Sequence, residues 1–565
     1  MNSGPIQPMD LTSLRAVIED LQRNVVPSRL EKSQQPNKWT LQLGLRTING
    51  MKWIEISWFA EAPRIVQIPT PGKAGESSTL AKQFHNILRR MALIGIEHQG
   101  FERIVKLQFA NKPGENIQKT ILIEIMGRHS NLFLLDKESR IITMGRQVRE
   151  NQSRKRPIST GDNYIPPPSL KGIKPSLKES FDQWKYRLCL TPVTLKNSFQ
   201  ETYQGLSPSL LIQLVGKKKE EAIFILKSNI NNISLEEWER IFERWTHWLN
   251  SIENNVFSLR FNADNSFQVW EDGSKSRKES SQLSLRLGIY YSDLINKKSL
   301  KGLELLTHKK INNLLKSEKN SLIVQDSLLE NTKNIDDIKK KADELLSLRN
   351  PSRDQIQNAQ KLYLRAKKLR RSIPLIKERV QHHLLRINNI ETSKVFLDEI
   401  LTNTLENSYE KESNLEELYK ELEDFFPTKN ITHKNSKKAK IESLKPLEIF
   451  SPNGLTIQIG RNHRQNEFIS IKKARKGDLW FHAQECPGSH VVLKSSNGLP
   501  EEIDIETAAN LAALFSRAKG NKNVPIFLVQ TSKLRRVSGG IPGTLTHTGG
   551  EVIWGKPKDG FKYLN

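Results

Sequence analysis

The chain contains very little cysteine, with only Cys189 and Cys486 among 565 residues. Two cysteines far apart in the sequence exclude a CxxC pair and a cysteine-rich zinc site, and they suit a reducing compartment. The segment Met1–Leu21 has no basic stretch followed by an apolar core, so it does not predict a signal peptide. No apolar run approaches the roughly 18 residues of a membrane span. We therefore expect a cytoplasmic protein without a membrane partner.

Motifs for catalysis, nucleotides and metals are also missing. The string Gly550–Lys556 has the GxxxxGK spacing of a P-loop, but Pro557 follows where a Ser or Thr hydroxyl is needed for Mg²⁺. His482, Cys486 and His490 are evenly spaced. A Pro-Gly pair between them breaks any helix, and no fourth ligand is near, so buried side chains are favoured over a metal site. No Ser, His and Asp trio has nucleophile-elbow context. We expect no cofactor, no metal and no catalytic residue.

What the chain has in excess is positive charge. Lys and Arg number 88 against 62 Asp and Glu, which gives a formal net charge of +26. Such an excess makes a polyanion the expected partner, with nucleic acid ahead of an anionic membrane. Hydrophobic residues make up 36% of the chain, a low share that indicates long solvated elements joining smaller cores. At roughly 150 residues a domain, the length predicts about four units.

The first unit, residues 1–168, mixes helical and strand patterns and predicts an α+β domain. Asp10 is placed to cap a helix, and Asn49-Gly50 is a typical hairpin turn. Tyr164–Pro168 is proline-rich and closes the unit as an extended connector. The predicted elements are helices over Leu11–Leu21 and Leu80–Leu93, a hairpin of Trp39–Leu45 with Trp53–Trp58, and strands over Arg103–Phe109, Thr120–Met126 and Asn131–Asp136.

The remaining units are helical and then mixed. Residues 169–289 predict a helical module in which Gln204–Pro208 resembles a helix-turn-helix with a Gly turn. Residues 290–428 carry apolar positions spaced four and three apart, typical of a coiled coil, and Arg349–Arg353 is a natural reversal. An antiparallel hairpin kinked at Pro374 is the favoured interpretation, and a parallel dimer is the alternative. Residues 429–446 form a basic linker. Residues 447–565 predict a C-terminal α/β domain, with strands at Leu455–Ile459, Val491–Leu493 and Val524–Gln530 and a helix over Glu506–Ala518 that stops at Gly520.

Three clusters of basic residues are candidates for phosphate contact. Each has a competing interpretation as a solvated face, and the overall charge favours RNA or DNA phosphate. The clusters are Arg146, Arg149, Arg154, Lys155 and Arg156; Lys361, Arg365, Lys367, Lys368, Arg370 and Arg371; and Lys533, Arg535 and Arg536.

Several separated motifs, in the same order along the chain, resemble the NFACT family. They are Glu124–Leu132, Tyr164–Pro168, Gly460-Arg-Asn, Asp478–His482 and Pro487–Val492. The resemblance covers nearly the whole chain and implies an NFACT-N domain, a helix-hairpin-helix module, a coiled coil and an NFACT-R domain. The NFACT-R motif falls on Asp478, Trp480, His482, Pro487, Gly488, Ser489 and His490.

The resemblance implies a ribosome-associated quality control factor. Members bind a large ribosomal subunit obstructed by peptidyl-tRNA, recruit tRNA and direct C-terminal tailing of the stalled chain without mRNA, with alanine in bacteria. The implied tRNA contacts are Glu102, Arg103, Glu124, Ile125, Met126 and Arg128. Glu102 stands where the family has Asp, which keeps the charge and lengthens the reach by one methylene. The ribosome would carry out peptidyl transfer, so the protein itself is not expected to be an enzyme, and it would act as a monomer on the subunit.

Two other functions remain as alternatives. NFACT-N is similar in fold to the N-terminal domain of formamidopyrimidine DNA glycosylases, which suggests a DNA-processing protein. Those enzymes use an N-terminal proline and usually a cysteine zinc finger, whereas this chain begins Met1-Asn2 and has two lone cysteines. Some bacterial members of the family have been labelled fibronectin-binding proteins, which suggests a surface adhesin. The missing export signal favours the ribosomal function over the adhesin.

Overall fold

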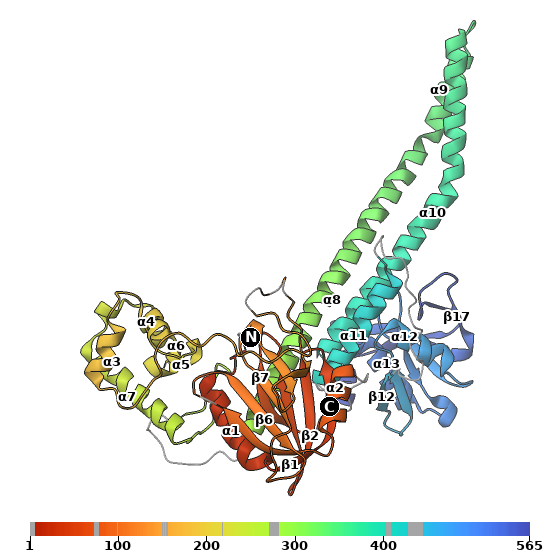
Figure 1. The fold of residues 1–565 in the computed structure, drawn as a ribbon. Coiled ribbons are helices and arrows are strands. Elements are labelled where there is room, and N and C mark those ends of the chain that lie inside the picture. Colours follow the sequence, from red (N-terminus) through yellow and green to blue (C-terminus); the bar gives the residue numbers. More distant parts are fainter. Residues whose placement is uncertain are drawn as a thin grey trace. The chain divides into compact units, whose positions relative to one another are not determined.

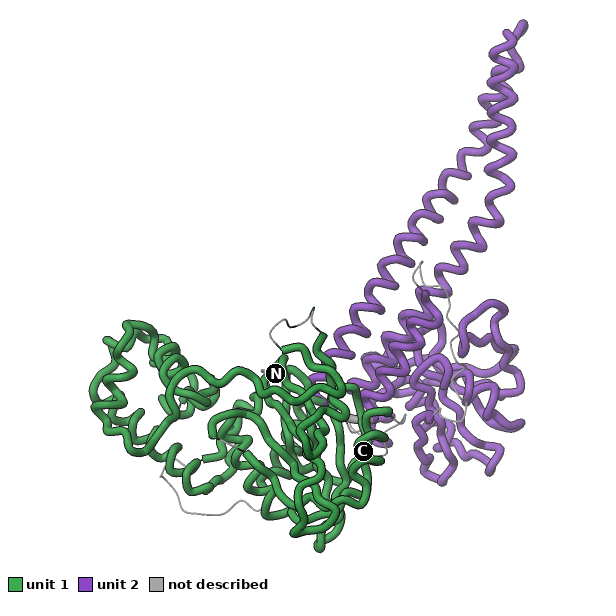
Figure 2. The backbone as a smooth tube through the Cα atoms, in the orientation of Figure 1, with its two compact units in different colours: residues 1–295 green, residues 296–565 purple. Residues whose placement is uncertain are grey.

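The computed structural model describes residues 6–72, 78–98, 100–149, 151, 153, 156–216, 218–270, 282–402, 408–427 and 445–564. Two compact units make up the chain, residues 1–295 and residues 296–565 (Figures 1 and 2). The first contains a large sheet and a helical module, and the second contains long helices and a smaller sheet. Most of the predicted linker 429–446 lies outside the described residues. None of the helices in the described ranges is both long enough and apolar enough to cross a membrane.

A nine-stranded antiparallel sheet forms the core of the first unit. Its spatial order is β4-β3-β2-β1-β5-β6-β7-β8-β9. The strands are β1 (Ser28–Asn37), β2 (Thr40–Thr47), β3 (Gly50–Ser57), β4 (Arg64–Ile68), β5 (Ala92–His98), β6 (Ile104–Ala110), β7 (Lys119–Glu124), β8 (Asn131–Leu135) and β9 (Ile141–Met144).

One face of this sheet is buried under helix α1 (Leu11–Val25), which Asp10 caps as expected. Apolar residues of the helix such as Leu14, Val17 and Leu21 share a core with inward-facing residues of the strands, including Leu107 and Ile121. Because side chains alternate along a strand, the residues between them face the opposite side. That side carries a smaller apolar cluster over β7 to β9. The prediction of a mixed α+β N-terminal domain is confirmed.

The predicted helix over Leu80–Leu93 is wrong in its second half. Helix α2 (Thr79–Leu88) ends earlier, and Ala92–His98 forms strand β5 in the middle of the sheet. Arg90 adopts a left-handed φ of 71°, and its backbone N–H donates to the carbonyl of Leu30 at 3.3 Å. Pairing with β1 therefore overrides the helical spacing of the apolar residues.

Five helices form the module that follows. They are α3 (Phe181–Leu188), α4 (Leu195–Thr202), α5 (Pro208–Val215), α6 (Lys219–Lys227) and α7 (Leu235–Glu253). Their shared core is rich in tryptophan, and the ring of Trp184 lies 5.5 Å from that of Trp238 and 6.0 Å from that of Trp245. Gly205, with φ of 78°, lies in the turn between α4 and α5. Phe101 of the sheet domain packs against this core, so the module and the sheet share one unit.

The long helices run out and back as a hairpin. Helix α8 (Leu283–Asn331) and helix α9 (Ile335–Leu346) go one way, and α10 (Arg353–Thr402) returns, followed by α11 (Ser408–Phe425) (Figure 1). Glu318 of α8 accepts from Arg386 of α10 at 2.8 Å and lies 2.8 Å from Nδ1 of His383. Pro374 lies inside α10, and the helix continues through it.

A six-stranded sheet with order β12-β13-β15-β14-β16-β19 forms the C-terminal domain. The strands are β12 (Leu447–Phe450), β13 (Thr456–Ile459), β14 (Leu479–Ala483), β15 (Val491–Leu493), β16 (Val524–Gln530) and β19 (Glu551–Gly555). Neighbouring strands all pair antiparallel, so the predicted α/β arrangement is corrected to α+β. Helix α13 (Glu502–Leu514) covers one face. It ends before the predicted Ala518, because Arg517 N–H instead donates to the carbonyl of Pro487.

Candidate nucleic-acid interface

One end of the N-terminal sheet gathers residues that the sequence placed in two separate groups. Strand β7 ends at Glu124 beside the start of β6 at Ile104 and the start of β8 at Asn131. The backbone N–H of Ile125 donates to the carbonyl of Arg103 at 2.9 Å, which brings the two predicted tRNA-contacting segments side by side. At the same end Arg146 follows β9, a strand paired with β8.

Glu124 is the buried centre of this end of the sheet. Its side chain is 1% exposed and accepts two bonds from the guanidinium of Arg156, with Nη1 to Oε2 at 3.0 Å. The hydroxyl of Tyr164 donates to it at 2.7 Å. Burial alone would lower the pKa of Arg156, and the bond from Glu124 outweighs it, so this pKa is raised. The carboxylate therefore ties the proline-rich connector to the sheet and is shielded from a ligand.

The guanidinium of Arg103, unlike the carboxylate of Glu124, remains available to a ligand. The side chain is half-buried and makes no hydrogen bond or ion pair with the described residues. Burial lowers the pKa of Arg103, while the charges of Asp10 and Glu102 raise it. A desolvated, unpaired guanidinium that presents a planar fork of donors suits bidentate contact with a phosphate or a base edge.

Asp10, which the sequence analysis treated only as a helix cap, lies close enough for its charge to act on Arg103 without a direct bond. Its carboxylate accepts from Ser13 N–H at 2.9 Å and from the hydroxyl of Ser207 at 2.8 Å. Ser207 belongs to the helical module, so Asp10 joins the module to the sheet domain next to Arg103. The charge of Asp10 near an arginine was not visible from sequence, since the two lie about ninety positions apart.

Glu102 lies at the rim of a pocket on the exposed face of the sheet. The pocket has a volume of about 590 Å³ and lies over strands β5 to β8. Ile104, Leu122 and Leu135 supply apolar lining, and Tyr164 also lines the pocket. The carboxylate of Glu102 also accepts from Leu170 N–H at 3.2 Å, which holds the chain after the proline-rich connector.

The other predicted tRNA contacts differ in exposure. Ile125 is fully buried, Met126 is half-buried, and Arg128 is exposed with its Nε 3.0 Å from Nε2 of His129. Arg146 donates from Nη1 to the carbonyl of Arg128 at 3.2 Å. Arg103, Arg128 and Arg146 are therefore the cations that the structure brings together at this end of the sheet.

The first predicted basic cluster does not stay together as a surface. Arg146 lies at the end of the sheet, and Arg156 forms an ion pair with Glu124. Arg149 is exposed and has an interaction partner within the chain. Arg154 and Lys155 lie outside the described residues.

The second basic cluster forms one exposed patch on helix α10. All six of its side chains are exposed, and none has an ion pair within the described part of the chain: Lys361, Arg365, Lys367, Lys368, Arg370 and Arg371. Among the apolar residues between them, Ala366 is buried, Leu362 and Leu369 are half-buried, and Leu364 is exposed. The six unpaired cations are spread around the exposed side of the helix, and together they have the charge that a phosphate backbone requires.

The third basic cluster lies beside the C-terminal sheet. Strand β17 (Leu534–Arg536) pairs with β18 (Leu545–His547), and Lys533 immediately precedes it. Lys533 and Arg535 are exposed, while Arg536 donates to Glu467 at 2.6 Å and is partly neutralised.

Residues of the predicted NFACT-R motif hold the C-terminal domain together. Trp480 stacks on His482 with ring centroids 5.4 Å apart, and His490 meets Trp480 edge-on at 5.2 Å. Burial lowers the pKa of His482 to about 4, and Ser470 lies 2.9 Å from Nδ1 of His490. These imidazoles serve as packed, neutral side chains.

The Pro-Gly-Ser part of the same motif docks on the end of helix α13. Ser489 N–H donates to the carbonyl of Phe515 at 2.8 Å, and the carbonyl of Pro487 accepts from Arg517 N–H at 2.8 Å. A Cβ at Gly488 would come within 3.1 Å of that carbonyl of Phe515, so a larger residue would separate the two segments.

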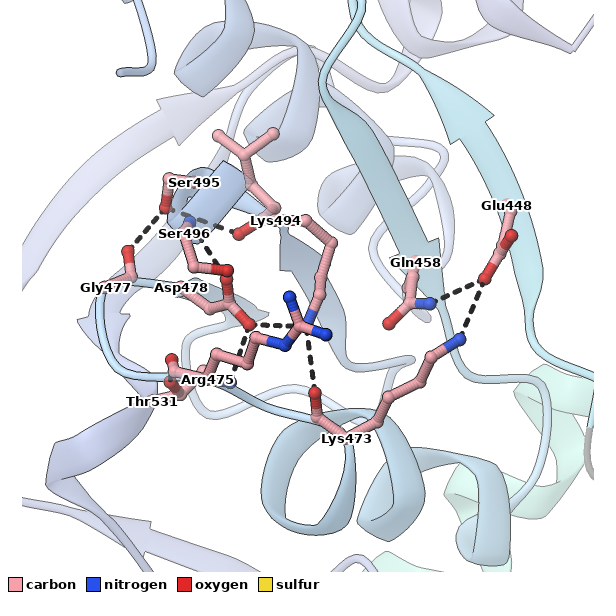
Figure 3. A network of polar contacts seen from close by, with 11 residues as sticks. Glu448, Gln458, Lys473, Arg475, Gly477, Asp478, Lys494, Ser495, Ser496 and Thr531 are labelled. Atoms are coloured by element: carbon pink, nitrogen blue, oxygen red, sulfur yellow. Dashed lines mark hydrogen bonds and ion pairs between the residues drawn. The ribbon is translucent and has the colours of Figure 1, made fainter. Parts of the chain in front are cut away.

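Asp478, the first residue of the motif, lies in the interior of a polar network (Figure 3). It is fully buried and pairs with Lys494, which is 6% exposed, with Nζ to Oδ2 at 2.5 Å. Burial would raise the pKa of Asp478, but bonds from Lys494, Ser496 and Arg475 lower it below its usual value. Asp478 is therefore a charged residue that fixes the backbone around it.

Comparisons with known proteins identify two family domains in the chain. Residues 10–350 match the family described as NFACT N-terminal and middle domains, and residues 445–548 match the NFACT protein RNA binding domain. A protein of Streptococcus pneumoniae named Rqc2 homolog RqcH is 26% identical over 571 residues, covering 96% of each chain. The protein of the same name from Bacillus subtilis is 24% identical over 580 residues, covering 95% of this chain and 96% of its own.

A solved structure titled as the C-terminal part of the fibronectin/fibrinogen-binding protein from Streptococcus suis is 26% identical. It covers 47% of this chain and 98% of its own, and its TM-score of 0.38 is too low to support an argument about fold or function. The match to the family's N-terminal and middle domains covers more than half of the chain. The chain belongs to the NFACT family.

Proposed function

We propose that this protein is a ribosome-associated quality control factor. It binds large ribosomal subunits obstructed by peptidyl-tRNA, recruits tRNA and directs tailing of the stalled chain without mRNA. Relatives named Rqc2 homolog RqcH, which match 95–96% of the chain, and the RNA-binding domain at its C-terminus support this proposal. The protein positions RNA, and the ribosome supplies the peptidyl transfer.

The observation that carries the proposal is the group of arginines at one end of the N-terminal sheet. Arg103, Arg128 and Arg146 come from three separate segments and meet around the end of β7. Glu124 beneath them is shielded, so the ligand meets mainly cations there. This charge pattern suits the phosphates and base edges of an RNA loop, whose unpaired bases are accessible to side chains.

The basic patch on α10 supplies a second, separate RNA contact in the other unit. Six exposed cations along one helix suit the backbone of a long RNA such as ribosomal RNA. We therefore assign tRNA to the N-terminal domain and ribosomal RNA to the α10 patch. This division of roles gives each site its own expected phenotype.

Sedimentation of cell extract tests the proposal. We expect the protein to migrate with free large subunits that carry nascent chains, and to remain with them at moderate salt. Co-purified RNA is then sequenced, and a tRNA of one kind is expected beside ribosomal RNA. Migration of the protein only as free chain, even at low salt, contradicts the proposal. Export to the cell surface, detected by labelling intact cells, would favour the adhesin instead.

A further inference from the structure

A second basic segment of the C-terminal domain lies outside all three clusters seen in the sequence. Residues 472–476 read Lys-Lys-Ala-Arg-Lys and are followed by Gly477 and the buried Asp478. Lys472, Arg475 and Lys476 are exposed, and none of them takes part in an ion pair within the described ranges. Lys473 is different, because its ammonium pairs with Glu448 at 3.3 Å.

This segment is held in one conformation by buried groups. The carboxylate of Asp478 accepts from the backbone N–H of Arg475 at 2.8 Å, and the ammonium of Lys494 donates to the carbonyl of Lys473 at 3.0 Å. The hydroxyl of Ser495 donates to the carbonyl of Gly477 at 2.6 Å. Figure 3 shows the contacts of Asp478, Lys494 and Ser495 with this loop. The backbone is fixed by these bonds, while the three cationic residues are exposed.

Two further hydrogen bonds, both from Thr531, place this loop beside the third basic cluster. Thr531 donates from its hydroxyl to the carbonyl of Arg475 at 3.1 Å and from its backbone N–H to the carbonyl of Asp478 at 3.0 Å. Lys533 follows two residues later and is exposed. The loop and the segment leading to β17 are therefore neighbours, and both carry exposed cations.

We infer that the loop Lys472–Gly477 is a preorganised binding site for the phosphate backbone of RNA, with Asp478 and Lys494 as positioning residues. The inference rests on the proposed function in that the C-terminal domain meets RNA. Cations on a rigid backbone lose less conformational entropy on binding than cations on a mobile tail. A backbone with a charge at every nucleotide matches three unpaired cations on one surface, whereas a small anion would need only one.

Removing the charges of the loop tests the site. The full-length variant carries Lys472→Gln, Arg475→Gln and Lys476→Gln, and a matched control carries three changes of exposed lysines in the same domain, Lys519→Gln, Lys522→Gln and Lys558→Gln. Binding to a labelled RNA duplex is measured as a function of salt. We expect about a tenfold loss of affinity and a salt slope smaller by about two to three for the loop variant, and less for the control. Equal losses in both variants overturn the inference.

The role of the fixed backbone is tested without changing charge. Gly477 has φ of 99°, a conformation that residues with a Cβ rarely adopt, although no atom lies closer than 3.8 Å to the new Cβ. Gly477→Ala is therefore expected to disturb the loop, lowering RNA affinity several-fold with all cations retained. Unchanged affinity and salt slope contradict preorganisation, and thermal unfolding confirms that the variant is folded.

These results separate the loop site from the proposed function. If the wild-type protein does not sediment with large subunits and the loop variant still loses affinity for RNA, the loop site stands and the ribosomal function fails. If the wild type sediments with large subunits and the loop variant binds RNA as the control does, the loop site alone is overturned.

Discussion

Glu124 and Arg156 form a paired carboxylate and guanidinium that fastens the proline-rich connector to the N-terminal sheet. The two residues lie 32 positions apart, and the hydroxyl of Tyr164 donates to the same carboxylate at 2.7 Å. The sequence predicts Glu124 as a tRNA contact, through the family resemblance, and Arg156 as a candidate for phosphate contact. Their pairing gives both of them an internal partner and leaves the arginines around them to meet a ligand.

Replacing Arg156 by Ala is expected to destabilise this end of the sheet. Glu124 would be left as a buried carboxylate with only the Tyr164 hydroxyl as partner, a change that costs about 3 kcal/mol. Hydrogen exchange of the β7 and β8 amides should become faster by about a hundredfold. Arg140→Ala is the control, because its ion pair with Asp136 is exposed and should matter by less than about 1 kcal/mol. Equal exchange rates of the β7 and β8 amides in the two variants would contradict the stabilising role of the buried pair of Glu124 and Arg156.

Replacing Arg103 by Ala should abolish co-purification of tRNA while subunit association remains largely intact. Its guanidinium is the half-buried cation at the sheet end that has no bond to the described residues. Arg103→Lys keeps the charge and loses the planar fork, so partial recovery is expected. RNA extracted from the purified variants is compared on a gel. Loss of ribosomal RNA together with tRNA would show that the two roles are not separate.

Neutralising part of the α10 patch should weaken binding of the protein to the large subunit and leave its binding to tRNA intact. Changing Arg365, Lys368 and Arg371 to Gln removes three exposed cations, and the affinity for subunits should fall with a salt slope smaller by about two to three. A control removes three exposed lysines from α8: Lys309, Lys316 and Lys319. Sedimentation at increasing salt provides the measurement. A salt slope unchanged from wild type contradicts the assignment of ribosomal RNA to this patch.

Because of the buried Glu399 in α10, we expect the stability of the second unit to depend on pH. Its side chain is buried, and neither carboxylate oxygen accepts a hydrogen bond from the described residues. Burial raises its pKa to about 8 from 4.5, against the charges of Arg461 and Lys519. Because the folded pKa lies above the unfolded one, its contribution to stability is complete below about pH 4 and is lost as the pH rises toward 8.

The variant Glu399→Gln should resemble the protonated acid at every pH. We expect its stability to match the wild type near pH 4 and to exceed it above about pH 8, by up to about 5 kcal/mol. Hydrogen exchange of the α10 amides across this range gives the comparison. A difference that stays constant with pH contradicts the raised pKa of Glu399.

Much of the local structure could be predicted because it depends on neighbours in the sequence. The Asp10 cap, the Asn49-Gly50 hairpin and the strand Val524–Gln530 appear where the pattern predicted them. The cap and the hairpin depend on contacts within a few residues, whereas the strand Val524–Gln530 pairs with remote strands and was found from its own apolar and β-branched residues. Strand β5 was missed because its pairing with β1 comes from a segment more than fifty positions earlier, and such pairing overrides local spacing.

The sequence by itself determined the family, the order of the parts and the excess of positive charge. Only the tertiary structure decided which charges are available to a ligand. Arg156 forms an ion pair with Glu124. Arg103, 21 positions before Glu124, has a side chain that forms no hydrogen bond or ion pair with the described residues. The basic loop at Lys472 became visible only through the buried Asp478 and Lys494 that hold it. Partner choice and burial depend on distances between remote segments, and a linear pattern of charges does not contain those distances.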